Sequence, residues 1–487
     1  MLNGCVFSYY ITEETITVPG LPVEAFFGKY RILMDSHMPF SVASNGVNAC
    51  AIFGVAVNVI SGDSDDIAQK IAETCKEIRD VVEYEKSLGG KYLLLFKHDE
   101  QYYILGDATC SIPVYYNVDD SFACSSNYQY IADMKQYRQD SEYAAIRRGG
   151  DISQAMPYDI THYRQIKQLI PNHYLDVNNQ KPIRFINASV KQKVIPVEEA
   201  TELVSPMIEK ILARYLRDFQ IYCPITAGRD SRVVLAFLMK SNAEFSCYTI
   251  KHPEHREDAQ DIVIPVELCQ KEGIEHRLIE DVVVPDTLIN EVDKVLGKEN
   301  YSFRTLRIGQ TIKDNFGCGA IINGDIIGQI GKCSLHRDIP AVFATPAYFQ
   351  CKLHNFSKDA KIQLQQWLNG IKASGEKVNT FDLFSIENRM GRWASQSSAV
   401  YSAIGQISLN IFNSRSIIYI WTAVERKKRK NSLLHLDLIR NTVPSLLDTP
   451  FEVDESKFVK LSKSTGLFYL LASYMKFYVE KLKFAKK

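Results

Sequence analysis

Residues 221–239 have the sequence IYCPITAGRDSRVVLAFLM, and this stretch carries the strongest structural signal in the chain. An apolar run leads into residues 226–231 (TAGRDS), and an amphipathic pattern follows, which predicts a strand, a turn of small residues and a helix. Small residues leave the backbone N–H groups of such a turn open, and the N-terminus of a helix carries positive partial charge. The unit therefore predicts a site that holds an anion such as pyrophosphate.

The side chains of this turn suit phosphate chemistry. Thr226 and Ser231 add hydroxyl donors, and Arg229 and Arg232 can neutralise phosphate charge. Asp230 would be repelled by phosphate, so a bridging Mg²⁺ is its natural partner. The alternative interpretation is structural: a tight turn, with Asp230 and Ser231 capping the helix that follows.

The sequence after this unit favours the nucleotide interpretation. A second strand over 245–250 ends in Thr249 and Ile250, and a helical pattern leads from there to a third strand over 274–279. Doubly wound parallel sheets bind nucleotides at the carboxyl ends of their strands, where the strand order reverses. We therefore expect Thr249 and Ile250 to lie at the same edge of the sheet as the turn.

The length of 487 residues exceeds one ordinary hydrophobic core and predicts two domains. Before residue 185 the pattern is mostly that of short strands, interrupted by one helix over 65–85. The strands are expected at 51–60, 92–97, 102–105, 114–117 and 173–177. From residue 196 helical patterns alternate with apolar runs, which is typical of a parallel sheet with crossover helices, and after residue 359 we expect helix almost throughout.

Composition excludes several classes of partner. Lys plus Arg and Asp plus Glu both count 57, so no net charge would draw the chain to nucleic acid. The 11 cysteines are an odd number without a C-x-x-C pair, which favours reduced thiols in a cytoplasmic protein. No segment has the length of a membrane span. Residues 466–487 are apolar, aromatic and then basic, which fits a terminal helix packed on its own domain or a helix in peripheral contact with a membrane.

A family resemblance rests on four segments of the sequence. Residues 226–231 resemble the S-G-G-x-D-S pyrophosphate loop of N-type ATP pyrophosphatases, in the T-x-G-R-D-S-R version of asparagine-synthetase-like proteins. Asp258 and residues 272–276 are similar to the helix and strand after this loop in asparagine synthetases. Residues 322–331 fall where the family has S-G-E-G-x-D-E-x-x-G-G, and residues 89–116 resemble its glutaminase-type domain.

The resemblance covers nearly the whole chain and implies an α/β fold. An α+β, Ntn-hydrolase-like sandwich is implied for residues 1–185. A doubly wound parallel sheet of the PP-loop, adenine nucleotide α-hydrolase-like type, with a helical C-terminal region, is implied for residues 190–487.

The resemblance also implies ATP and Mg²⁺ as cofactors, with Asp230 and Asp325 on the metal. Asp325 stands at the family's first Glu, however, and Gly328 stands where its metal-binding Asp is expected. Contacts with ATP are implied for Thr226, Ala227, Gly228, Ser231 and Gly324, and main-chain contacts with adenine for Thr249 and Ile250.

The first domain resembles a glutaminase that has lost its catalytic groups. Position 2 is Leu, where a working enzyme of this family has the Cys whose free amino group serves as base, and Cys5 has only an amide nitrogen. Phe53 and Val55 replace residues of the family's F-N-G-E-I-Y-N, so the oxyanion hole is lost as well. Cys50 begins a stretch like the start of an active glutaminase, yet the alternating pattern around it predicts an internal strand. We predict no glutamine hydrolysis.

The helical region has fewer signals. Arg389 and Arg392 lie at i and i+3, and either meet an anionic substrate or form salt bridges on a helix with Trp393 in the core. Residues 410–413 (NIFN) stand where the family has a P-F-x-D turn. Residues 425–430 (ERKKRK) are expected to be a solvated helix face.

These features predict an ATP- and Mg²⁺-dependent ligase that adenylates a small-molecule or glycan carboxylate and passes the acyl group to ammonia or an amine. Asp230, Arg229 and Arg232 would act in catalysis, with Lys457 or Lys460 as the late lysine that related synthetases use at the adenylation step. The resemblance leaves open uronic acid amidation in surface-polysaccharide synthesis, ring closure as in β-lactam or lasso-peptide synthetases, and asparagine synthesis. The alternative is a degenerate synthetase fold that acts as a nucleotide-binding or scaffold protein, and the sequence leaves a homodimer open.

Overall fold

The computed structural model describes residues 6–140, 156–185, 193–253, 256, 258–298, 301–333, 339–353, 355–375 and 377–452, together with 471, 474, 475, 478, 479 and 482. Leu2, Cys5, Lys457 and Lys460 lie outside the described residues, as does most of the segment 466–487.

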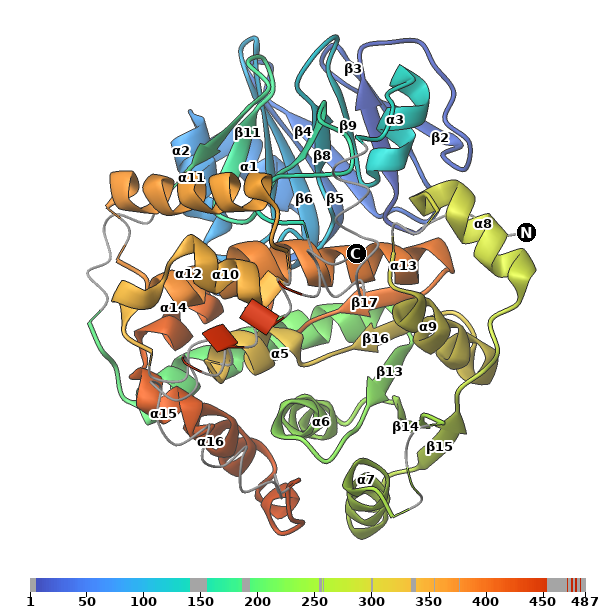
Figure 1. Cartoon of the computed structure of the whole chain (residues 1–487), viewed down its shortest axis with the longest axis vertical. Coiled ribbons are helices and arrows are strands. Elements are labelled where there is room, and N and C mark those ends of the chain that lie inside the picture. The colour runs from blue at the N-terminus through green and yellow to red at the C-terminus, as the bar shows by residue number, and fades with distance from the viewer. Residues whose placement is uncertain are drawn as a thin grey trace.

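The N-terminal part of the chain forms a sandwich of two antiparallel sheets, drawn from blue to green at the top of Figure 1. The first sheet has the order β10-β8-β9-β1-β3-β2, with β1 (Tyr9–Thr12), β2 (Val23–Phe27), β3 (Tyr30–Met34), β8 (Tyr115–Asn117), β9 (Ala123–Ser125) and β10 (Ile166–Gln168). The second has the order β12-β11-β7-β6-β5-β4, with β4 (Phe40–Ser44), β5 (Asn48–Asn58), β6 (Leu88–His98), β7 (Gln101–Gly106), β11 (His173–Asp176) and β12 (Lys181–Arg184).

Apolar side chains fill the space between these two sheets. Ile11 and Ile32 of the first sheet are buried in one cluster with Phe53, Leu93 and Leu95 of the second. The outer face of the second sheet packs against α1 (Ile67–Thr74) and α2 (Ile78–Glu85), and that of the first against α3 (Tyr128–Lys135). The sandwich therefore has helices on both outer faces.

The prediction of a single helix over 65–85 is wrong, because the chain forms two helices there. Cys75 ends α1 with an extended backbone (φ −87°, ψ 127°). A reciprocal pair of capping contacts then starts α2, in which Asp80 accepts the backbone N–H of Glu77 and Glu77 accepts an N–H of the new helix. The apolar spacing continues across the break, so periodicity alone does not reveal it.

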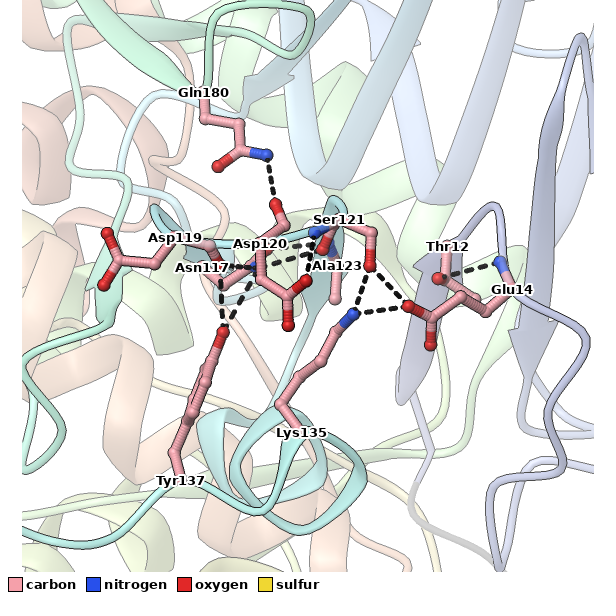
Figure 2. A network of polar contacts seen from close by, with 10 residues as sticks. All are labelled: Thr12, Glu14, Asn117, Asp119, Asp120, Ser121, Ala123, Lys135, Tyr137 and Gln180. Atoms are coloured by element: carbon pink, nitrogen blue, oxygen red, sulfur yellow. Dashed lines mark hydrogen bonds and ion pairs between the residues drawn. The ribbon is translucent and has the colours of Figure 1, made fainter.

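A polar network closes the turn between β8 and β9, as Figure 2 shows. Asn117 Nδ2 donates to the carbonyl of Ser121 (2.9 Å), and its Oδ1 accepts the N–H of Ala123 (2.7 Å). Gln180, in the turn between β11 and β12 of the other sheet, donates to the carbonyl of Asp120 (3.0 Å). These bonds tie the two sheets together at one edge of the sandwich.

The second half of the chain contains a five-stranded parallel sheet with the order β15-β14-β13-β16-β17. Its strands are β13 (Ile221–Pro224), β14 (Ser246–Lys251), β15 (His276–Glu280), β16 (Ala320–Ile322) and β17 (Ile407–Leu409). The helices around it include α5 (Val197–Asp218), α6 (Arg229–Ser241), α7 (Gln260–Lys271), α8 (Asp286–Leu296) and α9 (Phe303–Phe316). The strand order reverses between β13 and β16, which makes this the switch point of a doubly wound sheet.

Both faces of the parallel sheet are apolar and covered. Tyr222 packs on the face that carries Ile312 of α9, while Ile221 and Cys223 pack on the face that carries Leu268 of α7. This alternation is what a sheet with helices on both sides requires. The α/β fold class predicted from the sequence is confirmed.

The helical region after residue 340 is only partly as expected, since β17 is a strand of the parallel sheet. Its helices are α10 (Pro346–Leu353), α11 (Lys358–Ser374), α12 (Thr380–Phe384), the π-helix η3 (Ser385–Ala394), α13 (Ser395–Ala403), α14 (Arg415–Ala423), α15 (Arg426–Lys430) and α16 (Leu433–Thr442). A short π-helical segment, η1 (Ile327–Gly331), follows β16, and the 3₁₀ turns η2 (Ala341–Phe343) and η4 (Pro444–Leu447) complete the described elements. Within the described residues, none of the helices is both long and apolar enough to cross a bilayer.

Buried ion pairs join the sandwich to the helical region. Arg415 of α14 bonds to Glu85 of α2 (Nε to Oε2, 2.6 Å), and both side chains are buried. Glu387 of η3 accepts two bonds from Arg184 of β12 (2.8 and 2.6 Å) and one from Asn172 (2.7 Å). Buried charges need such complete pairing, so these contacts fix how the two parts pack.

Candidate active site

The turn between β13 and α6 is closed by its own side chains. Thr226 N–H donates to Ser231 Oγ (3.2 Å), and Gly228 N–H donates to Thr226 Oγ1 (3.2 Å). Ala227 N–H donates to Asp261 Oδ1 of α7 (3.0 Å). The first three N–H groups of the turn are therefore bonded within the protein, and a phosphate would meet the N–H groups at the start of α6.

The start of α6 carries no side-chain cap. Gly228 is the N-cap residue with an extended backbone (φ −74°, ψ 170°), and the Ser231 hydroxyl lies close to that of Thr226 (3.3 Å). Asp230 lies inside the first turn of the helix rather than at the N-cap. The alternative in which Asp230 and Ser231 cap the helix is therefore not what the structure contains, and the N-terminal partial charge of α6 stays open to an anion.

Asp230 is held by residues far away in the sequence. His435 of α16 is fully buried, and its Nε2 bonds to Asp230 Oδ1 (2.9 Å). A Cβ at Gly328 would lie 2.5 Å from Asp230 Oδ2, and a Cβ at Gly324 would lie 3.0 Å from the Asp230 carbonyl oxygen. The loop after β16 thus packs directly on the turn, which requires glycine at both positions.

Asp230 and Asp325 form an electrostatic pair. Burial alone would raise the pKa of Asp230, yet the hydrogen bond to His435 and the nearby Lys332 and Arg229 hold it below its usual range. Burial and the neighbouring Asp230 raise the pKa of Asp325 to about 6. Two neighbouring carboxyl groups near the start of α6 suit a divalent cation.

These residues fit Mg²⁺ in part. No cluster of three or more His, Cys, Asp or Glu side chains that could hold a metal occurs within the described ranges. Mg²⁺, however, is commonly bound by one or two carboxylates and completes its shell with water and substrate phosphates. Asp230 and Asp325 match that pattern, since Asp230 Oδ2 faces the side-chain-free Gly328.

The two arginines of the turn have different surroundings. Arg232 is fully buried and donates to the carbonyls of Leu446 (3.0 Å), Thr449 (2.6 Å) and Pro450 (3.0 Å). Arg229, in contrast, lines a cavity. Arg229 therefore borders a cavity, whereas Arg232 anchors the chain after α16.

Two cavities meet at this turn. The first, of about 540 Å³, opens at the carboxyl ends of β13, β14, β16 and β17. Its lining includes the predicted residues Thr226, Thr249, Ile250 and Asp325, together with Lys91, Thr109 and Ser111 of the sandwich. The sequence did not predict that the sandwich would contribute to this cavity.

The second cavity, of about 530 Å³, lies on the other side of the turn. Its lining includes Ala227, Gly228, Arg229, Asp230, Gly328, Lys332, Lys430 and Glu452. Three cations face two carboxylates there, and the open N-terminus of α6 adds further positive charge. This side of the turn suits a polyanion.

Hydrogen bonds hold the carboxyl end of β14, where adenine was predicted to bind. Thr249 Oγ1 donates to the carbonyl of Ile225 (2.7 Å), and Ile225 N–H donates to the carbonyl of Tyr248 (2.8 Å). His252, just beyond β14, bonds through Nδ1 to Asp281 Oδ2 (2.6 Å) and also lines the first cavity. The sequence analysis did not assign a role to this His–Asp pair.

The helix with Arg389 and Arg392 is a π-helix, so the expected shared face at i and i+3 does not arise. Arg392 is buried and donates to the carbonyl of Ile160 in the sandwich. Trp393 is not a core residue, because it lines the first cavity, and Arg389 lies over its ring (5.8 Å). Of the two alternatives, neither a common anion-binding face nor a buried Trp393 is observed.

The expected solvated face over 425–430 is wrong for Arg429. This side chain is fully buried and pairs with Asp382 (Nη2 to Oδ2, 2.7 Å). Lys430 lines the second cavity. The run of basic residues in the sequence does not show that Arg429 is buried and that Lys430 lines a cavity, while Lys427 is exposed.

Cys50 lies inside β5, paired with Phe96 of β6, which confirms the predicted internal strand. Burial raises the pKa of its thiol, so a thiolate is disfavoured. Phe53 is fully buried in the core of the sandwich. Neither residue offers glutaminase chemistry.

A scan against protein-family models and a search of curated proteins gave no match. Among solved structures, the chain is similar to a glutamine phosphoribosylpyrophosphate amidotransferase from B. subtilis complexed with ADP and GMP (13% identity, 69% of this chain and 72% of that chain, TM-score 0.24). It is also similar to an NMN synthetase from Francisella tularensis (14% identity, 54% of this chain and 100% of that chain, TM-score 0.21). A U34-tRNA thiolase from Methanococcus maripaludis with its [4Fe-4S] cluster is a third neighbour (13% identity, 43% and 82%, TM-score 0.21). At these TM-scores the likeness carries no functional argument.

Proposed function

We propose that this protein is an ATP-dependent ligase that activates a carboxylate as an acyl adenylate and transfers the acyl group to ammonia or an amine. The supporting observation is the position of the turn at 226–231 between two cavities at the switch point of the parallel sheet. The cationic second cavity fits the phosphates, and the first fits the nucleoside and the acceptor. The resemblance of the turn to the pyrophosphate loop of asparagine-synthetase-like proteins supports the same assignment.

The proposed reaction has two steps. A carboxylate oxygen of the acceptor attacks the α-phosphorus of ATP, the new O–P bond forms, and the bond to the bridging oxygen breaks so that pyrophosphate leaves. The nitrogen of ammonia or an amine then attacks the acyl carbon, AMP leaves with the bonding electron pair, and the nitrogen loses a proton. Mg²⁺, held by Asp230 and Asp325, would supply positive charge for the leaving pyrophosphate.

The residues of this chain would act mainly by position and charge. The N–H groups at the start of α6, with Arg229 and Lys332, would stabilise the charge that develops on the pyrophosphate. His435 would keep Asp230 ionised and oriented. Because the glutaminase groups are absent from the sequence, the nitrogen would come from free ammonia or from an amine substrate.

The test is an ATP–pyrophosphate exchange assay with a panel of carboxylic acids. Asp230→Asn keeps an acceptor for His435 but removes the charge, and we expect exchange to fall at least about 100-fold. The matched control is Asp99→Asn, at the exposed turn between β6 and β7, which should leave exchange unchanged.

Two results would contradict the proposal. Equal exchange in Asp230→Asn and the wild-type protein would remove the role of Asp230. No exchange with any acid, together with no ATP binding by calorimetry, would favour the alternative of a degenerate synthetase fold that acts as a scaffold.

A further inference from the structure

The first cavity has a wall that the nucleotide does not explain. This wall is formed where β6 of the sandwich meets α13, and it carries Lys91, Ser395, Ser397 and Ser398. The turn that would bind phosphate reaches the same cavity through Thr226, just after the end of β13. If the proposed nucleotide lies at this turn, the wall is left for the second substrate.

Lys91 is a buried ammonium group that has no counter-ion among the described residues. Its residue is 2% exposed, and its Nζ donates to the carbonyl of Ser111 (3.1 Å) and to the hydroxyl of Ser398. No carboxylate of the described residues lies within 4.0 Å of this nitrogen. An ammonium group has three donors and a full charge, so two neutral acceptors leave it incompletely satisfied.

A second group on the same wall is also unsatisfied. Ser395 Oγ is buried, with the residue 1% exposed, and has no hydrogen-bond partner within the described part of the chain. Ser397, two residues later on α13, lines the same cavity. Buried hydroxyl groups are nearly always hydrogen-bonded in folded proteins, so an open hydroxyl beside an open cation indicates a polar ligand.

We propose that this wall binds the acceptor of the ligase and that the acceptor is a hydroxylated carboxylic acid, with its carboxylate on Lys91 and its hydroxyl groups on the serines of α13. The identification of this ligand as the acceptor rests on the proposed function. The binding of the acid to the wall does not. The sandwich would then form part of the substrate site instead of producing ammonia.

Three small probes separate the two parts of the proposal. D-glucuronate carries a carboxylate and hydroxyl groups, D-glucose carries hydroxyl groups alone, and cyclohexanecarboxylate carries a carboxylate alone. Binding of each is measured by isothermal titration calorimetry, without nucleotide and again with a non-hydrolysable ATP analogue and Mg²⁺. We expect affinity in the order D-glucuronate, cyclohexanecarboxylate, D-glucose.

Variants identify the groups that bind. Lys91→Met is nearly isosteric and should weaken D-glucuronate by about 10- to 100-fold, because a charge-assisted bond is lost. Lys97→Met, on the same strand but outside the cavity lining, should leave binding unchanged. Ser395→Ala should weaken D-glucuronate by about 3- to 10-fold and leave cyclohexanecarboxylate unchanged, with Ser402→Ala of the same helix as control.

A proton measurement distinguishes direct pairing from a structural role of Lys91. Burial lowers the pKa of Lys91 to about 8, and the nearby Asp107 opposes this only in part. A bound carboxylate would raise the pKa again, so the wild-type protein should take up about half a proton on binding D-glucuronate at pH 8. Lys91→Met should show no such uptake, and its melting temperature should not fall, because a costly buried charge has been removed.

Unchanged D-glucuronate affinity in Lys91→Met would overturn the anion site, and equal affinity for D-glucuronate and cyclohexanecarboxylate would overturn the hydroxylated class. The two proposals fail separately. Lys91-dependent binding of D-glucuronate without any pyrophosphate exchange would contradict the ligase activity but not the acid-binding site. Pyrophosphate exchange that is unchanged in Lys91→Met would contradict the acid-binding site but not the ligase activity.

Discussion

Burial, and after it the neighbouring Asp230 carboxylate, makes the ionisation of Asp325 unfavourable in the folded protein. Its pKa is raised from 3.8 to about 6, so the stability that the group contributes is present below about pH 4 and is lost as the pH rises through 6. Asp325→Asn is neutral at every pH. We expect it to be more stable than the wild-type protein by on the order of 2 kcal/mol at pH 8 and equal to it near pH 4.

Urea unfolding at pH 4, 6 and 8 measures this difference. A difference between the two proteins that stays constant with pH would contradict the raised pKa of Asp325.

Substitution of Asn117 tests how much the polar network between β8 and β9 contributes to stability. It is fully buried and bonds to the carbonyls of Asp119 and Ser121 and to the N–H of Ala123 (Figure 2). Asn117→Ala leaves these groups unpaired, and we expect a loss of about 2–4 kcal/mol in the free energy of unfolding. Asp119→Ala keeps the carbonyl and removes only an exposed side chain, so a similar loss there would show that the network is not the cause.

At the scale of elements, the packing of η1 on the start of α6 can be tested with glycines. Gly328→Ala places a Cβ 2.5 Å from Asp230 Oδ2 and must displace that carboxylate or η1. We expect ATP affinity to fall at least about 10-fold, as measured by calorimetry. Gly370→Ala, in α11, meets nothing within 4 Å and should leave ATP affinity unchanged while adding slightly to helix stability.

Two elements show why spacing along the chain predicts some helices and not others. The break between α1 and α2 rests on the capping contacts of Glu77 and Asp80, which apolar periodicity does not report. In η3 the wider turn changes which residues share a face, so that Arg392 faces the sandwich while Trp393 lines the cavity. Local patterns predict that a helix forms more reliably than which side chains it presents.

At the scale of the whole molecule, Glu387 joins the helical region to the sandwich. Burial alone would raise its pKa, but Arg184 and the hydrogen bond from Asn172 hold it below the usual range. The pair therefore stabilises the protein above about pH 4.5, and this contribution is lost as the pH falls through the lowered pKa. Arg184→Met leaves a buried unpaired carboxylate, and we expect a loss of about 3–5 kcal/mol at pH 7.

The double variant Arg184→Met with Glu387→Gln serves as the control. It removes both charges and should recover part of the stability in urea unfolding. If the double variant is no more stable than Arg184→Met, the lost packing rather than the unpaired charge explains the effect.

The sequence predicted much of the architecture because the relevant signals are local. The strand, turn and helix around residues 221–239 are specified by apolar spacing and small residues within a few positions of one another. The same holds for the strands near 92–97 and 102–105, and for Cys50 within a strand. The three-residue β17 was missed, because so short a strand between helices has no local pattern of its own.

By itself, the sequence determined the fold class and the strand, turn and helix around residues 221–239. The tertiary structure alone decided which distant groups complete the site: His435 bonds to Asp230 across 205 residues, and Lys91 meets Ser398 across 307. It also assigned Arg229 to a cavity and Arg232 to the interior. The physical reason is that local backbone preferences depend on neighbours along the chain, whereas the pairing and burial of a charge depend on which segments the fold brings together.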